Sequence, residues 1–158
     1  MTGHGKTWLP LLGFVGAAFL AGAIGSWATF ENVRSWYPSL NKPAWNPPNW
    51  IFGPVWTTLY ILMGVAIWRV WRMPVPAARR LVRVYFVQLF FNALWSVLFF
   101  GLKQPAWALA DIVMLWLMLV WLLLSVWRVE RPAGWLWLPY VLWVSFATAL
   151  NTAIVRLN

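Results

Sequence analysis

Five long apolar runs, separated by breaks that carry charge or proline, dominate the chain. They cover residues 8–30, about 47–68, about 81–102, 106–127 and about 134–155. A membrane-spanning helix needs about 20 mostly apolar residues, and each run meets that length. The runs are continuously apolar rather than alternating, which favours helices over strands. Because only helices and closed barrels satisfy their backbone groups in lipid, the pattern predicts an all-α bundle of five transmembrane helices.

Three of the breaks are short. Residues 72–76, 103–105 and 128–132 each combine a charged side chain with proline, and such short connections join antiparallel neighbours. Five spans place the two termini on opposite faces of the membrane. No internal repeat is evident, so we expect a single domain over residues 1–158.

The connection over about 31–46 is longer and of another kind. It holds Trp36, Tyr37 and Trp45, too apolar for a solvated linker, and prolines restrict its backbone. Long loops in compact proteins are usually functional or disordered. We predict an aromatic lid over one end of the bundle; the alternative is an interfacial loop lying among the lipid headgroups.

Composition supports a membrane protein. Hydrophobic residues make up 63% of the chain and charged residues only 9%, against about 25% charged in a soluble domain. The 16 tryptophans suit membrane–water interfaces. The net charge of +9 comes from residues between the apolar runs, which indicates topology signals rather than nucleic-acid binding. The absence of cysteine excludes disulfides and thiol catalysis.

The basic residues also predict an orientation. Lysine and arginine number eight on the side of the N-terminus and the second and fourth connections, and four on the other side. The positive-inside rule then places the N-terminus in the cytoplasm and the aromatic loop outside. The first run continues past the small residues 21–23 to Phe30, which favours a retained helix over a cleaved signal peptide. We expect an integral protein of a bacterial cell membrane.

Four strings resemble the TspO/translocator (tryptophan-rich sensory protein) family. The first loop, Trp-Tyr-Pro-Ser-Leu-Asn-Lys-Pro-Ala-Trp-Asn-Pro-Pro, is similar to the family signature W-Y-x-x-L-x-K-P-x-W-x-P-P. The others are Gln-Leu-Phe-Phe-Asn-Ala-Leu-Trp, Trp-Ala-Leu-Ala-Asp, and Pro-Tyr-Val-Leu-Trp followed by Ala-Thr-Ala-Leu-Asn. In order, they occupy residues 36–48, 88–95, 107–111, 139–143 and 147–151.

The resemblance implies a homodimer-prone, five-helix receptor or carrier. Its cavity, under the first loop, would bind porphyrins such as haem and protoporphyrin IX, and other hydrophobic ligands, with a sensory role in tetrapyrrole metabolism. An alternative is a light-dependent porphyrin-degrading enzyme that uses Trp56 and Trp143; a purely structural membrane partner is a third. The expected ligand-binding residues are Trp36, Tyr37, Trp45, Pro47, Trp56, Asn92, Trp95, Phe99, Trp107, Ala110, Trp143, Ala147 and Asn151.

Small residues at helical spacing form two candidate dimer faces. One consists of Gly13, Ala17, Ala21 and Gly25, and the other of Ala93, Val97 and Gly101. The resemblance favours the second as the dimer interface and leaves the first for packing inside the protomer.

Several polar groups fall inside the apolar runs. Gln88, Asn92 and Asn151 must find hydrogen-bond partners there, and they serve either to hold helices together or to face a ligand. Asp111 lies about one turn into the fourth run, and an intramembrane carboxylate is a functional candidate, although it could reach headgroup water or Lys103 instead.

We expect no metal site and no required cofactor. The single histidine, His4, lies in the N-terminal tail, and no recognisable haem-ligation motif is present. A porphyrin would then be held by its ring on tryptophan and phenylalanine. Its carboxylates would stay at the wet end of the bundle, near Lys42 or Arg34.

Overall fold

The computed structural model describes residues 8–158, so His4 lies outside the described part. The chain is all-helical over these residues, and five helices are long and apolar enough to cross a membrane. They are α1 (Trp8–Thr29), α3 (Phe52–Trp71), α4 (Pro76–Ser96), α5 (Pro105–Val129) and α6 (Arg131–Leu157). The predicted fold class is confirmed.

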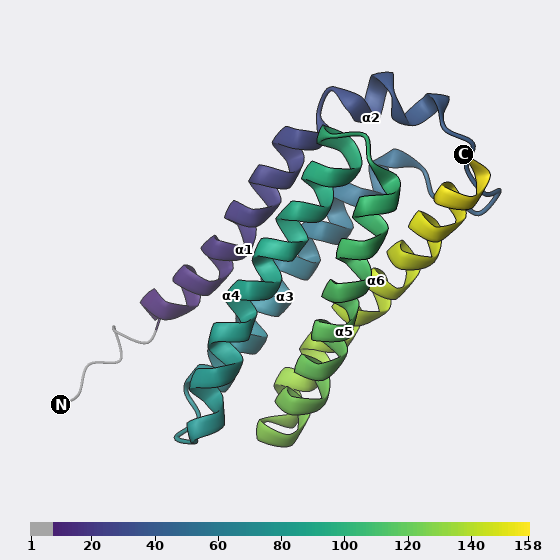
Figure 1. Cartoon of the computed structure of the whole chain (residues 1–158). Coiled ribbons are helices and arrows are strands. Elements are labelled where there is room, and N and C mark those ends of the chain that lie inside the picture. The colour runs from purple at the N-terminus through teal and green to yellow at the C-terminus, as the bar shows by residue number, and fades with distance from the viewer. Residues whose placement is uncertain (1–7) are drawn as a thin grey trace.

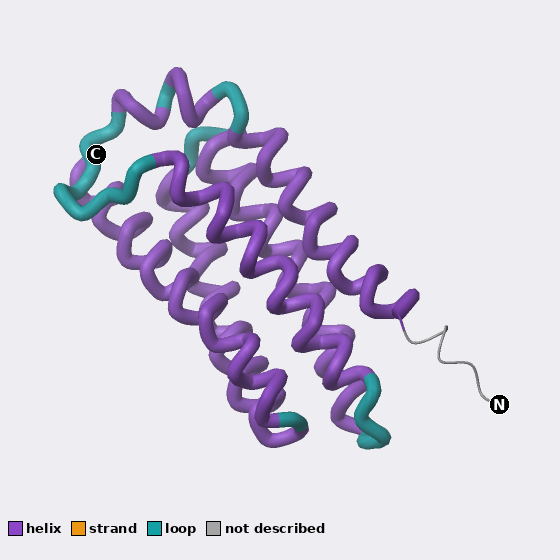
Figure 2. The backbone as a smooth tube through the Cα atoms, turned by 180° about the vertical axis from the view of Figure 1, so that it is seen from behind, coloured by secondary structure: helices purple, strands orange, loops and turns teal. Residues whose placement is uncertain are grey.

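The long helices form a closed ring. Helix α1 packs against α3 and α4, α3 packs against α6, and α5 joins α6 to α4. Figures 1 and 2 show the helices running up and down between two ends, with α1 beginning at the end opposite the C-terminus. The start of α1 and the end of α6 therefore lie on opposite sides of the membrane, as five spans require.

Charged residues extend the helices beyond their apolar runs. Helix α4 begins at Pro76, about five residues earlier than predicted, and includes Arg79, Arg80 and Arg83 in its first turns. Long basic side chains can reach the membrane surface from a helix end while their stems cover apolar neighbours. The guanidinium of Arg80 accordingly lies 5.0 Å from the ring centroid of Trp121. Helix α6 likewise begins at Arg131, where the side chain of Glu130 accepts a hydrogen bond from the Ala133 N–H.

The other end of α4 departs from α-helical geometry. Residues Val97–Gly101 form a single π-helical turn, η4. The apolar pattern did not indicate this turn, which ends the helix beside the short connection to α5.

Small residues let α1 approach its neighbours inside the protomer. Ala21 and Gly25 are buried, whereas Gly13 is exposed. A Cβ added to Gly25 would lie 2.9 Å from the Ser96 hydroxyl oxygen on α4. Ala21 and Gly25 therefore pack inside the protomer, as predicted for this face, whereas Gly13 does not.

The lid, residues 31–46, folds over the end of the bundle in short helical turns (Figure 1). They are α2 (Asn32–Ser35) and η2 (Tyr37–Ser39), and a further turn, η3 (Asn49–Ile51), leads into α3. The Asn32 side chain donates to the Phe100 carbonyl oxygen at 2.8 Å. The Asn41 N–H donates to the Asn158 side chain at 3.0 Å, and the Asn158 amide donates back to the Asn41 carbonyl at 2.9 Å. The lid is therefore tied to η4 and to the end of α6.

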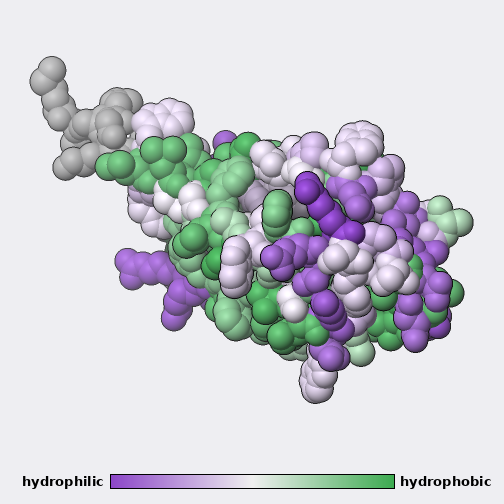
Figure 3. Space-filling model, turned by 90° about the horizontal axis from the view of Figure 1, so that it is seen from above, coloured by the Kyte–Doolittle hydropathy of each residue, from purple (hydrophilic) through white to green (hydrophobic). Residues whose placement is uncertain are grey.

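The outer surface of the helices is apolar. Large side chains such as Leu12, Trp27, Phe90 and Leu142 are exposed, as expected of groups that face lipid. Seen from the lid end, hydrophilic side chains gather over the face, and hydrophobic ones show around its rim (Figure 3). The protein is an integral membrane protein with five spans.

Candidate functional site

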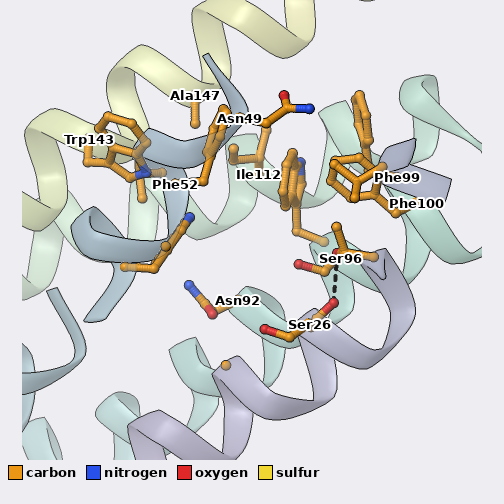
Figure 4. A pocket seen from close by; sticks show the side chains of 18 of the residues that line it. Ser26, Asn49, Phe52, Asn92, Ser96, Phe99, Phe100, Ile112, Trp143 and Ala147 are labelled. Carbon is orange, nitrogen blue, oxygen red and sulfur yellow. Dashed lines mark hydrogen bonds between the residues drawn. The ribbon is translucent and has the colours of Figure 1, made fainter. Parts of the chain in front are cut away.

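A cavity of about 730 Å³ lies in the lid half of the bundle, and all five long helices contribute to its wall. Ligand pockets commonly measure about 300–1,000 Å³. Figure 4 shows Trp143 and Phe52 on one side, Phe99 and Phe100 on the opposite side, and Asn92 and Ser26 at another edge. The wall is therefore mainly aromatic, with a few polar groups.

Eight of the predicted ligand-binding residues line this cavity. They come from the lid, α3, α4, η4 and α6, and the ring arrangement brings them together: Tyr37, Trp56, Asn92, Trp95, Phe99, Trp143, Ala147 and Asn151. Their contact with a ligand stays a prediction.

The other five do not line the cavity. Trp36 and Trp45 lie one layer behind the wall, with ring centroids 5.8 Å from Phe99 and from Phe146, respectively. Pro47 lies in the connection that follows the lid. Trp107 and Ala110 are on the outer side of α5, where Trp107 is 68% exposed. The sequence could not predict this position, because on an apolar helix it does not distinguish the face toward lipid from the face toward the cavity.

A chain of hydrogen bonds starts at Tyr60 and Asn92 in the cavity wall and continues into the buried core. The Tyr60 hydroxyl donates to the Asn92 Oδ1 at 3.2 Å, and the Asn92 Nδ2 donates to the Tyr140 hydroxyl at 3.0 Å. Tyr140 in turn donates to the Gln88 Oε1 at 2.8 Å. The Gln88 amide completes the chain with a 3.8 Å contact to the Met63 sulfur. Gln88 therefore holds helices together, whereas Asn92 does so and also faces the cavity.

Asn151 is committed to packing as well. Its Oδ1 accepts from the Trp95 indole N–H at 3.0 Å, and its Nδ2 donates to the Pro105 carbonyl at 2.9 Å. These bonds fix α6 to the start of α5 and set the orientation of the Trp95 ring. The ring stacks on the buried Phe99, with centroids 5.2 Å apart, so Phe99 supports the Trp95 ring from one side.

Among the described residues, three side chains have buried polar atoms without a hydrogen-bond partner: Asp111, Trp137 and Trp143. Both carboxyl oxygens of Asp111 are buried without a hydrogen bond, so the suggested contact with Lys103 is not made. Asp111 does not line the cavity. The indole nitrogen of Trp143 is also buried and unpaired, and this residue does line the cavity.

The two cations predicted to meet ligand carboxylates differ in their surroundings. The Lys42 ammonium donates to the Tyr37 carbonyl at 2.7 Å, to Leu40 at 2.9 Å and to Pro38 at 3.4 Å. These bonds engage all three of its protons in the lid. Arg34 is exposed and lines the cavity, so its role toward a ligand carboxylate stays a prediction.

Tyr37 closes the lid end of the cavity and is 4% exposed. Its hydroxyl donates to the Asn46 Oδ1 at 2.7 Å. Burial raises the pKa of the Tyr37 phenol, and the hydrogen bond with Asn46 acts in the opposite direction. The hydroxyl therefore remains a neutral donor at physiological pH.

Sequence reasoning missed several wall residues. Tyr60, which lines the cavity, follows Trp56 by four positions, so helical spacing from this predicted tryptophan could have identified it. The contribution of α1, including Gly22 and Ser26, had no such signal because its small residues suggested packing alone.

The fold and the site define a polytopic α-helical membrane protein with an aromatic, lidded cavity between its spans. Comparison with known proteins assigns this architecture to a family. The chain belongs to the TspO/MBR family, whose profile matches residues 14–157.

Relatives resemble the chain over nearly its whole length. It is 41% identical over 157 residues to the tryptophan-rich protein TspO of Chlorobaculum tepidum, covering 97% of this chain and 98% of that protein. It is 39% identical over 150 residues to that of Archaeoglobus fulgidus (95% and 97%). It is 35% identical over 154 residues to the translocator protein of Homo sapiens (96% and 91%). Since these sources include an archaeon, a bacterium and a mammal, the bacterial membrane stays a prediction.

Proposed function

We propose that this protein binds porphyrins, such as protoporphyrin IX and haem, in the cavity beneath the lid. It acts as a membrane receptor or carrier with a sensory role in tetrapyrrole metabolism. The observation that carries the proposal is the aromatic wall of a cavity of about 730 Å³ with a cation at its lid end. Membership of the TspO/MBR family supports it.

The cavity suits a flat, wide, apolar ligand. The Trp95 ring is supported by Phe99 stacked against it, and the Trp56 ring is stacked on Tyr60 with ring centroids 5.4 Å apart. A macrocycle buried against such rings gains apolar contact over its whole face. Its carboxylates would lie at the lid end, where Arg34 meets them without deep desolvation.

The test is a titration of purified protein with protoporphyrin IX, followed by tryptophan quenching and porphyrin absorbance. Trp143→Ala should weaken binding by about 2 kcal/mol, roughly thirtyfold in Kd, because a buried aromatic anchor is lost. Trp107→Ala is the matched control, since Trp107 lies outside the cavity and is 68% exposed. Equal affinity of the two variants, with helical content unchanged by circular dichroism, would exclude this site.

A second variant tests the anionic end of the ligand. Arg34→Gln should weaken binding mildly at low salt and have little effect at high salt, because an exposed charge pair is screened. The dimethyl ester of protoporphyrin IX, which has no carboxylate, should bind wild type and Arg34→Gln equally. Repeating the titration in the dark and in the light separates binding from light-dependent degradation.

A further inference from the structure

The cavity has an exposed edge, and that edge belongs to one pair of helices. Among the lining residues, Phe19, Ala23 and Ser26 of α1 are exposed, as are Gly53 and Thr57 of α3. The other exposed lining residues lie at the lid end of these two helices: Phe30, Arg34, Asn49 and Trp50. The lining residues from α4, η4, α5 and α6 are all buried or half-buried. The exposed edge is therefore a slot between α1 and α3.

The course of α1 explains the slot. Far from the lid, α1 and α3 cross closely: a Cβ added to Gly64 would lie 2.8 Å from the Val15 Cα. A Cβ added to Gly22 of α1 would lie 2.4 Å from the ring of Tyr60 on α3. Nearer the lid, α1 contacts α4 instead, through Gly25 and Ser96. On the α3 side, a Cβ on Gly53 would meet nothing within 4 Å.

On the side of η4 and α6, the lid covers the end of the cavity that faces water. Tyr37 is 4% exposed and packs on Phe99 and Phe100, with ring centroids 6.2 and 5.5 Å away. The reciprocal hydrogen bonds of Asn41 with Asn158 hold the lid against the end of α6. The slot, by contrast, runs along two membrane-spanning helices and so faces lipid.

The slot changes in polarity along its length. Its wall is mainly apolar, and two of its hydroxyls are satisfied within their own helices: Thr57 donates to the Gly53 carbonyl at 2.9 Å, and Thr29 donates to the Gly25 carbonyl at 2.7 Å. At the lid end, the polar side chains of Arg34 and Asn49 line the cavity. This gradient matches that of a bilayer leaflet, from hydrocarbon to headgroups.

We propose that ligands reach the cavity sideways from the bilayer, through the slot between α1 and α3, while the lid stays closed. The slot admits flat amphiphiles that already lie in the leaflet with an anionic end at the headgroups. This proposal rests on the proposed function for its probe, protoporphyrin IX, and adds to it the route and the orientation of the ligand.

The experiment compares a narrowed slot with a locked lid in protein reconstituted into phosphatidylcholine vesicles. Stopped-flow tryptophan quenching measures uptake of protoporphyrin IX. Gly53→Leu places a side chain in the slot, and Gly16→Leu is its control, because a Cβ on Gly16 also meets nothing within 4 Å. Gly53→Leu should slow uptake on the order of tenfold, because association rate constants of mutants of one binding site vary over roughly one to three decades. Gly16→Leu should not slow it.

The lid is locked through Asn41→Cys and Asn158→Cys, joined by oxidation or by a short bismaleimide and checked by mass spectrometry. The chain has no other cysteine, so the crosslink is unambiguous. Uptake by the locked protein should match that of the uncrosslinked variant. Slow uptake with a locked lid, together with normal uptake by Gly53→Leu, would overturn the proposal.

A wild type that takes up no porphyrin would refute the proposed function but not the slot. In that case, Ala147→Cys places a single thiol on the cavity wall contributed by α6. A pyrene maleimide dissolved in the vesicles should alkylate it, more slowly when combined with Gly53→Leu and at an unchanged rate with Gly16→Leu. Equal labelling rates in the two combinations would refute lateral access.

Discussion

Replacing Gly64 with alanine tests the close crossing of α1 and α3 directly. The added Cβ would lie 2.6 Å from the Val15 Cγ2, 2.8 Å from its Cα and 2.9 Å from its backbone nitrogen. A side-chain atom could rotate away, but the two backbone atoms can move only if α1 moves. The substitution therefore perturbs the packing of one helix on another rather than a single rotamer.

Two opposing effects set the change in the free energy of unfolding that Gly64→Ala causes. Alanine in place of glycine inside a helix is favourable by about 1 kcal/mol from backbone entropy. Overpacking of a close contact costs roughly 1–3 kcal/mol, and a backbone contact lies at the upper end of that range. We therefore expect Gly64→Ala to destabilise the protein by about 1–2 kcal/mol. Gly16→Ala, where the Cβ meets nothing within 4 Å, should be neutral or stabilising by up to about 1 kcal/mol.

The assay is equilibrium unfolding in mixed detergent micelles with increasing sodium dodecyl sulfate, followed by tryptophan fluorescence and circular dichroism. The two glycine variants share the same chemical change and the same pair of helices, so their difference isolates the steric contact. If Gly64→Ala were as stable as Gly16→Ala, the close crossing, and with it our explanation of the slot, would be wrong.

Three further predictions concern other contacts. Arg69 donates to both carboxylate oxygens of Glu130, which lowers the pKa of that carboxyl; Glu130→Gln should therefore lower stability by about 1 kcal/mol or less at neutral pH. That deficit should shrink as the pH falls below about 4.3, the ordinary glutamate pKa, and disappear once the pH is below the lowered pKa of Glu130 in the folded protein, where wild type takes up a proton and loses the same contribution. A deficit independent of pH would contradict this assignment. Asn92→Leu should destabilise by about 1–3 kcal/mol, measured by the same unfolding assay, because it leaves the buried Tyr60 hydroxyl without its acceptor and removes the donor to the Tyr140 hydroxyl; an unchanged midpoint would show that these hydrogen bonds are dispensable. Gly101→Leu should weaken the expected homodimer in detergent crosslinking without unfolding the protomer, since a Cβ there lies 3.7 Å from Ala28; undiminished crosslinking would move the interface elsewhere.

The placement of individual aromatic residues shows where sequence reasoning succeeds and fails. Trp56, Trp95 and Trp143 line the cavity as predicted, and the family resemblance rather than any periodicity placed them there. Trp107 was assigned by the same resemblance, yet it lies on the outside of α5. Lys42 carries a charge suited to a carboxylate, but its protons are engaged by lid carbonyls, which no pattern in the sequence indicates.

Length and hydropathy alone determined the five spans, the aromatic lid and the opposite placement of the helix ends. Lipid makes this inference strong, because an unpaired backbone group in hydrocarbon is costly and a long apolar run has to be a helix. Helix ends were less certain, since arginines such as Arg79 and Arg80 extend a helix into the interface without lengthening its apolar run.

The tertiary structure alone decided which helix faces meet and what lies between them. In water, the apolar face of a helix identifies its buried side, but in a bilayer the lipid-facing and core-facing sides are both apolar. The order of helices around the ring, the cavity wall and the slot between α1 and α3 therefore depend on close contacts such as those at Gly64, Gly22 and Gly25. Glycine at these positions permits such contacts, but only the folded chain shows which neighbour each one meets.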